Sequence, residues 1–170
     1  MTRQIKSKKR VRDFGEVFTP DFIVNKINDL CEPEISDITK RVLEPACGEG
    51  VFLCDILSRR LKKCKTPFEC LVAVSGLYGI DIQDDNVFIC RLNMYRETLT
   101  KCKDLLKDER SLAAFCDALT TILTTTVLQG DTINKPEEIE FTFYEPIWEK
   151  ESFGVITVAL DKMIDKNNIV

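Results

Sequence analysis

The stretch LEPACGEGVF, residues 43–52, joins two apolar runs through a short loop that contains two glycines. Pro45 ends the first run, which has the character of a short strand, and apolar residues recur at helical spacing over residues 51–61. Gly48 and Gly50 lack the side chains that would hold a ligand away, and both can adopt positive φ. The stretch therefore predicts a strand, a tight loop and a helix, with the loop as a candidate ligand site.

The residues of this loop limit which ligand it can hold. No Gly-Lys-Ser/Thr follows, so it is not the lysine-bearing phosphate loop. Only its first two glycines fit the dinucleotide pattern G-x-G-x-x-G. An isolated G-x-G is more often a tight strand-to-helix turn without a ligand. The loop alone therefore leaves both alternatives open.

Upstream of the loop, the sequence predicts a helix. Thr19 is the expected N-cap, Pro20 the first helical residue, and Asp21 lies in the first turn. The apolar residues Ile23, Ile27 and Leu30 then follow at helical spacing, so we expect them on one buried face.

Downstream of the loop, helices and strands are expected to alternate. The predicted elements are a helix over 68–76 closed by its final glycine, a strand over 77–82, a long helix over 84–106, a helix over 111–123 and a strand over 124–131. Two further apolar runs, residues 139–148 and 153–160, flank a charged turn and are compatible with a hairpin. Strands separated by helices imply a mostly parallel α/β sheet with helices on its faces.

We expect one domain over residues 13–170, preceded by a basic and flexible N-terminal segment, residues 1–12. Six Lys and Arg side chains lie within Arg3–Arg12, although the whole chain of 170 residues has a net charge of -4. Such a run is usually a solvated terminus, and contact with nucleic-acid phosphates is the alternative.

Composition excludes several classes of function. The chain has eight cysteines without a CxxC pair and no histidine, so we expect neither a metal site nor a Ser/His or Cys/His nucleophile. The basic start is not followed by the apolar core of a signal peptide, which favours a cytoplasmic, reducing location. No uncharged apolar stretch is long enough to cross a membrane.

Two acidic residues are expected beside the glycine loop, because parallel sheets bind ligands at the C-terminal ends of their strands. Asp81 ends one predicted strand and could accept the hydroxyls of a ribose, or could simply be a helix N-terminal charge. Asp131 ends the next strand and could accept from an adenine amino group, or could be a turn residue in QGDT.

Four segments, in order, resemble the cofactor-binding half of N6-adenine DNA methyltransferases. They are FGEVFTP (14–20), LEPACGEGVFL (43–53), LYGIDI (77–82) and LQGD (128–131). The similarity is to the gamma group and to the modification subunits of type I and fused type II restriction-modification systems. It implies a Rossmann-like methyltransferase fold with helices on both sheet faces, either truncated or with a C-terminal β-hairpin, and S-adenosylmethionine as cofactor. A loop with Glu44 and no lysine also suits a ligand without phosphate.

The resemblance also implies roles for individual residues. Phe18, Thr19 and Pro20 match the segment that closes over the methionine part of the cofactor. The loop beneath it corresponds to Glu44, Pro45, Ala46, Cys47, Gly48, Gly50 and Phe52. Asp81 matches the ribose-binding acid, Ile82 the apolar neighbour of adenine, and Asp131 the acid near the adenine amino group. For Cys47, a role as a small buried residue is a sufficient alternative.

The catalytic signature of these enzymes, Asn or Asp followed by Pro-Pro and an aromatic residue, does not occur in the 170 residues. We therefore assign no catalytic residue. The first hypothesis is a cofactor-binding domain that is inactive alone, or that is completed by a partner chain carrying the catalytic motif and a DNA-recognition domain. The alternative is a non-catalytic regulatory or protein-interaction module on the same fold, and methylation of another substrate is the weakest hypothesis.

Overall fold

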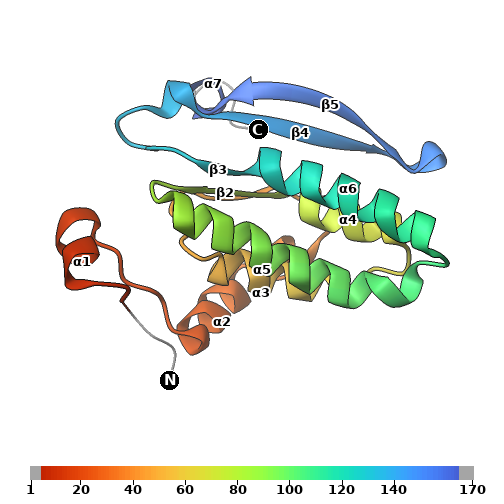
Figure 1. The fold of residues 1–170 in the computed structure, drawn as a ribbon, viewed down its shortest axis with the longest axis horizontal. Helices are drawn as coiled ribbons and strands as arrows, with labels where there is room; N and C mark the ends of the chain where they lie inside the picture. Colours follow the sequence, from red (N-terminus) through yellow and green to blue (C-terminus); the bar gives the residue numbers. More distant parts are fainter. Residues whose placement is uncertain (1–4, 165–170) are drawn as a thin grey trace.

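A three-stranded parallel sheet, in the order β1-β2-β3, lies at the centre of the computed structural model, which describes residues 5–164 (Figure 1). Its strands are β1 (Val42–Glu44), β2 (Leu77–Asp81) and β3 (Val127–Gln129). The helices are α1 (Lys8–Phe14), α2 (Asp21–Leu30), α3 (Val51–Leu61), α4 (Pro67–Ser75), α5 (Asp84–Cys102), α6 (Glu109–Thr126) and α7 (Leu160–Ile164). A second sheet consists of β4 (Glu140–Ile147) and β5 (Ser152–Ala159).

The register of the parallel sheet brings the ends of its strands to one edge. Glu44 of β1 pairs with Gly79 of β2, and Asp81 of β2 pairs with Gln129 of β3. The glycine loop, Asp81 and the residues after Gln129 therefore lie close together, as the strand pattern predicts. The α/β class and the parallel sheet are confirmed.

Helices cover one face of this sheet. The other face is covered by the β4-β5 hairpin, where helices were expected. Leu77 and Val127 belong to the large core formed with α3, α4, α5 and α6. Tyr78 and Ile80, which point the other way, pack against Phe141 and neighbouring residues of the hairpin side. Right-handed crossovers that add strands in one direction place their helices on the same face. Figure 1 shows the β4-β5 hairpin above the sheet, opposite α3 and α5.

The hairpin predicted from residues 139–160 is confirmed. Strands β4 and β5 pair antiparallel from Glu140↔Ala159 to Ile147↔Ser152. They form a separate two-stranded sheet rather than an extension of the parallel one. Aromatic contacts attach the hairpin to the body: the ring of Phe153 lies 5.1 Å from that of Phe68 on α4, and Tyr78 lies 5.1 Å from Phe141.

The predicted buried face of the first long helix is wrong. Helix α2 buries Val24 and Asn28, whereas Ile23, Ile27 and Leu30 are 36%, 44% and 85% exposed. The two stripes are neighbours on the helix surface, and Asn28 is fixed by a 2.8 Å hydrogen bond to a carboxylate of α3. The apolar spacing therefore predicted the helix correctly. It did not show which of two adjacent faces of the helix would pack against the rest of the protein.

The start of α2 also differs from the prediction. Pro20 occupies the N-cap, the helix begins at Asp21, and no side chain caps its first turn. Thr19 is thus outside the helix. By contrast, α4 begins as its sequence indicates, with Thr66 and Glu69 forming a reciprocal capping box.

The third strand is shorter than predicted, because α6 continues through the threonine run to Thr126. The hydroxyl of Thr124 donates to the carbonyl of Thr120, and that of Thr125 donates to the carbonyl of Thr121, each at 2.9 Å. These bonds satisfy the hydroxyls within the helix, so β-branching alone is a poor guide here. Only Val127–Gln129 is extended.

One fully buried arginine joins several elements of the core. Arg60 of α3 is 0% exposed, and its guanidinium donates to the carbonyls of Ile35 at 2.7 Å, Lys40 at 2.9 Å and Ala73 at 3.2 Å. Burial lowers its pKa to about 10. No carboxylate contacts this guanidinium among the hydrogen bonds of the described residues, so backbone carbonyls stabilise its charge.

Cys70 of α4 and Cys102 at the end of α5 form a disulfide in the structure. Both are fully buried. The sequence gives no sign of this pair, because the two cysteines are 32 residues apart and become neighbours only when the helices pack. None of the helices within residues 5–164 combines the length and the apolar character needed to cross a lipid bilayer.

Candidate ligand-binding site

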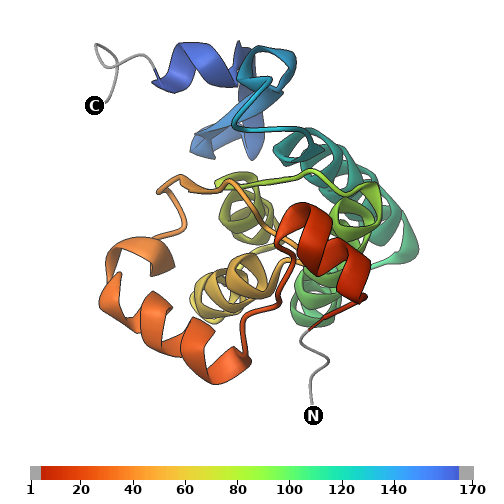
Figure 2. The same cartoon turned by 90° about the vertical axis from the view of Figure 1, so that its left-hand side faces the viewer.

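A cavity of about 640 Å³ lies at the C-terminal edge of the parallel sheet, between the strand ends and the N-terminal segment, residues 5–19. Figure 2 shows α1 in front of this edge. The predicted binding residues that line the cavity are Phe18, Thr19, Glu44, Pro45, Ala46, Cys47, Gly48, Phe52, Asp81, Ile82 and Asp131. Segments from four parts of the sequence therefore meet around one space, and three of them follow strand ends, as the strand-end argument predicts.

Two predicted residues, Pro20 and Gly50, do not line the cavity. Pro20 is the N-cap of α2, and Gly50 is the N-cap of α3 with φ 85°. A Cβ at position 50 would lie 2.5 Å from the sulfur of Cys90. Glycine is thus required at position 50 by its backbone conformation and by its packing against α5. Gly50 does not line the cavity.

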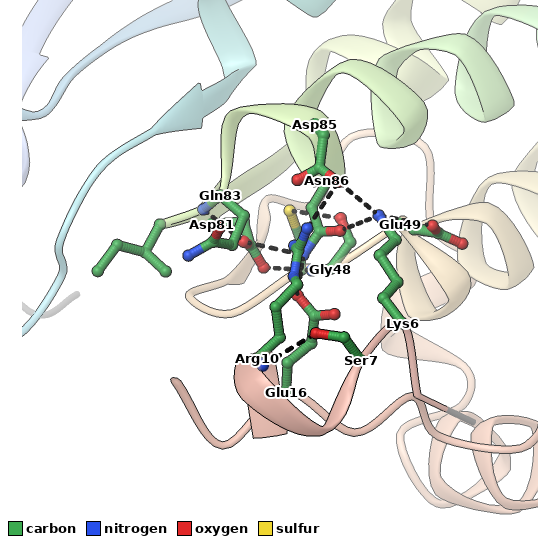
Figure 3. Close-up of polar contacts among 12 residues, drawn as sticks. Lys6, Ser7, Arg10, Glu16, Gly48, Glu49, Asp81, Gln83, Asp85 and Asn86 are labelled. Carbon is green, nitrogen blue, oxygen red and sulfur yellow. Dashed lines mark hydrogen bonds and ion pairs between the residues drawn. The ribbon is translucent and has the colours of Figure 1, made fainter. Parts of the chain in front are cut away.

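Asp81 organises the floor of the cavity. Its Oδ2 accepts a 2.9 Å hydrogen bond from the backbone N–H of Gly48, and its Oδ1 accepts from the N–H of Gln83 at 2.8 Å and the amide of Asn86 at 3.1 Å. Figure 3 shows these groups converging on one carboxylate. A carboxylate has about four acceptor positions, so three are used by the protein and one remains for a ligand.

The first glycine of the loop is needed for this arrangement. Gly48 has φ 54°, which turns its N–H toward Asp81, and the ring of Phe18 lies 3.5 Å from where a Cβ would be. A side chain here would be strained by the positive φ, although its Cβ would make only an ordinary contact with Phe18. The loop, the second strand and the N-terminal segment are thereby held together at one residue.

Asp131 lines the same cavity but is engaged by its own loop. Its Oδ1 accepts from the backbone N–H groups of Ile133 at 3.0 Å and Asn134 at 2.9 Å, and its Oδ2 accepts from the Asn134 amide. The side-chain hydrogen bond from Asn134 lowers the pKa of Asp131. This is the turn role that QGDT allows, and a contact with adenine stays a prediction.

Cys47 is a buried thiol beneath the loop. It is 4% exposed, and a Cβ on Gly79 of β2 would lie 3.1 Å from its sulfur. The side chain of Cys47, together with burial, raises the pKa of the neighbouring thiol of Cys90. A small buried side chain packed against a strand has a structural role, in agreement with the alternative given for Cys47.

The basic N-terminal segment is tied to the cavity walls by ion pairs. Lys6 Nζ lies 2.9 Å from Glu49 and 3.0 Å from Asp85, and Arg10 Nη1 lies 2.7 Å from Asp85 (Figure 3). Helix α1 buries no residue, so these charges provide much of its attachment. The segment therefore differs from the solvated terminus that its composition indicates, because acids at the starts of α3 and α5 pair with it.

The electrostatics of this attachment favour ionised partners at neutral pH. The hydrogen bond from Arg10, with a further one from Lys6, lowers the pKa of Asp85 to about 2. The same contact raises the pKa of Arg10. Because the carboxylate is half-exposed, its pairs are sensitive to salt.

The charge of the cavity walls restricts the class of ligand. Five carboxylates line it, those of Asp13, Glu16, Glu44, Asp81 and Asp131. Among the described residues that line the cavity, none is Lys or Arg. Such walls repel phosphates and favour a ligand that carries positive charge. Within residues 5–164, no group of three or more His, Cys, Asp or Glu side chains could hold a metal ion.

Comparison with known families agrees with this geometry. Residues 4–112, more than half of the chain, match the model of the family described as N-6 DNA methylase. The chain belongs to the N-6 DNA methylase family. The matched residues include the N-terminal segment, the glycine loop and Asp81. At the same stringency, no curated protein and no solved structure matches.

Sequence reasoning missed several residues of this methylase-family cavity. They are residues 13–17 of the N-terminal segment, Val51 of α3, Gln83 and Asn86 at the start of α5, and Gly130 and residues 132–134 around Asp131. Glu16 lies inside the motif FGEVFTP, so attention to the charge within that motif could have found it. Asn86 had no such signal, because its role depends on the contact between α5 and the N-terminal segment.

Proposed function

We propose that this N-6 DNA methylase family chain binds S-adenosylmethionine in the 640 Å³ cavity. The observation that carries the proposal is a cavity at the strand ends with five carboxylates and no basic residue in its walls. S-adenosylmethionine carries a positive sulfonium and an ammonium group and no phosphate. Dinucleotides, the other common ligands of such sheets, would place their pyrophosphate against these acids.

The proposed roles of the residues follow their places in the cavity. Asp81 offers its remaining acceptor position to a ribose hydroxyl, and the half-exposed Ile82 next to it offers an apolar surface to adenine. Phe18 and Gly48 lie against each other, and both line the part of the cavity that would hold the methionine moiety. Asp131, already satisfied by its own turn, would contribute mainly its negative charge.

We further propose that the chain is the cofactor-binding part of an N6-adenine DNA methyltransferase of the restriction-modification type. The motif Asn/Asp-Pro-Pro-aromatic, which shapes the site for a flipped adenine, is absent from the 170 residues. A partner chain with that motif and a DNA-recognition domain would then complete the enzyme. Such a reading frame among the neighbouring genes would support this arrangement.

Isothermal titration calorimetry of the full chain with S-adenosylmethionine tests the first proposal. We expect saturable binding to the wild-type chain and at least about tenfold weaker binding to Asp81→Asn, because a charged acceptor is lost. Asp117→Asn on the exposed surface of α6 is the matched control and should bind as the wild type does. No heat at millimolar ligand, or equal affinity for all three proteins, would reject the assignment.

A methyl-transfer assay tests the second proposal. Purified chain alone should transfer no labelled methyl group to adenine-containing duplex DNA, because no residue is assigned to position the adenine amino group. Transfer should appear when a partner chain carrying the catalytic motif is added. Transfer by the chain alone would refute the division of labour, and cofactor binding with no transfer in any combination would favour a regulatory module.

A further inference from the structure

Glu16 is the most deeply buried carboxylate with an unused oxygen at the cavity. Its side chain is 9% exposed, lines the cavity, and lies between Arg10 of α1 and Asn86 of α5 (Figure 3). The proposed function counts Glu16 among the acidic walls of the cavity but assigns it no contact with the ligand. The surrounding protein donates hydrogen bonds to one of its two carboxylate oxygens and none to the other.

One oxygen is fully satisfied and the other has no donor. Oε2 of Glu16 accepts from Arg10 Nε at 2.7 Å and from Asn86 Nδ2 at 3.1 Å, and it pairs with a second nitrogen of Arg10. Oε1 is buried, and among residues 5–164 no donor lies within hydrogen-bonding distance of it. A buried acceptor without a partner is costly, and of the buried side-chain atoms without a hydrogen bond in the described residues, Oε1 of Glu16 is the one that belongs to a cavity-lining residue. The ion pair with Arg10 accounts for the burial of Oε2, but it does not account for the burial of Oε1 without a donor.

Glu16 is also linked directly to the group proposed to hold the ligand. The amide nitrogen of Asn86 that donates to Glu16 also donates to Oδ1 of Asp81 at 3.1 Å. The two carboxylates therefore share one donor and lie near each other at the cavity, Asp81 at the end of β2 and Glu16 in the N-terminal segment. Since the terminal torsion of a glutamate is soft, a small rotation turns Oε1 to the cavity while Oε2 keeps Arg10.

We propose that Glu16 is a further ligand-binding residue, whose Oε1 accepts a hydrogen bond from a donor group of the bound cofactor. This assignment rests on the proposed binding of S-adenosylmethionine. Two groups of that ligand have the required chemistry, a ribose hydroxyl beside Asp81 and the ammonium of the methionine part. Either one supplies the partner that Oε1 lacks and couples ligand binding to closure of the N-terminal segment.

The substitution Glu16→Gln isolates this role. Glutamine keeps the volume and can turn its amide oxygen to Arg10 and Asn86, which places an NH₂ donor where Oε1 was an acceptor. The fold should therefore persist, with a ligand-free melting temperature close to that of the wild type. The dissociation constant for S-adenosylmethionine should rise about tenfold or more. Glu138→Gln, an exposed glutamate that pairs with Lys135, is the matched control and should change neither quantity.

Titration with 5′-methylthioadenosine, which has the ribose but no amino-acid part, distinguishes the two donors. If Glu16→Gln weakens both ligands, the donor is a ribose hydroxyl; if it weakens S-adenosylmethionine alone, the donor is the ammonium. Both results support the proposal. Unchanged affinity for both ligands, while Asp81→Asn still weakens them, would overturn the role of Glu16 and leave the proposed function standing. Absence of binding to the wild-type chain would overturn both.

Discussion

Replacement of Gly50 by alanine is expected to lower the free energy of unfolding by roughly 3 kcal/mol. The residue has φ 85°, which costs any L side chain about 1–2 kcal/mol. The new Cβ would also lie 2.5 Å from the Cys90 sulfur and 3.3 Å from its Cα. Relief requires α3 and α5 to separate, and overpacking of this kind costs about 1–3 kcal/mol. Urea denaturation followed by circular dichroism measures the change.

Gly15→Ala provides the matched control for this prediction. Gly15 has φ 66°, but no atom lies within 4 Å of the position of its Cβ. Only the backbone strain should remain, about 1 kcal/mol, and it acts on the end of α1 rather than on the core. A Gly50→Ala variant no less stable than Gly15→Ala would show that α3 and α5 do not meet as described.

Replacement of Arg60 by methionine is expected to cost about 3 kcal/mol, although methionine is apolar and similar in length. The change leaves three carbonyls without their donors, those of Ile35 and Ala73 in buried hydrogen bonds and that of Lys40 in a part-buried one. These carbonyls belong to the segment before β1 and to α4, so the loss affects the packing of several elements at once. Thermal and urea unfolding of the two proteins give the difference.

The adjacent arginine is the control for Arg60→Met. Arg59 makes ion pairs with Asp29, Glu32 and Asp55, of which the acids at positions 29 and 32 lie at 2.7 Å and 3.2 Å. Surface ion pairs contribute little, so Arg59→Met should cost no more than about 1 kcal/mol. If the two variants lose stability equally, the buried guanidinium is not the structural centre that its hydrogen bonds indicate.

Local patterns in the sequence predicted the elements that form the floor of the cavity. The Gly-x-Gly loop and the apolar run before Asp81 each have a signature within a few residues, because turn and strand preferences are local. Parallel pairing then brings Glu44, Asp81 and Asp131 to one edge, which is why most predicted residues line the cavity.

Features that depend on long-range packing could not be predicted in this way. The face of α2 that is buried depends on the hydrogen bond between Asn28 and Asp55. The second face of the sheet is covered because aromatic residues of the hairpin pack against it. The ordered contacts of Lys6 and Arg10 require acids that lie about 40–80 positions away in the sequence. A run of basic residues does not reveal which acids will pair with it. The packing of the N-terminal segment against the cavity was therefore the least predictable part of the site.

The basic segment still presents charge to a partner. Lys8, Lys9 and Arg12 are exposed, whereas Lys6 and Arg10 are paired with acids. Contact with DNA phosphates through the exposed residues would weaken steeply with added salt. The segment thus combines a wall of the proposed cofactor site with a basic run whose side chains are partly exposed.

Nuclear magnetic resonance with glycine-selective ¹⁵N labelling tests the central claim, that S-adenosylmethionine occupies this cavity. Gly15, Gly48 and Gly130 line the cavity, whereas Gly76 and Gly154 do not. Titration should shift the amide signals of the first three residues saturably and leave the other two in place. Unchanged signals at Gly15, Gly48 and Gly130, or shifts confined to Gly76 and Gly154, would contradict the proposed site.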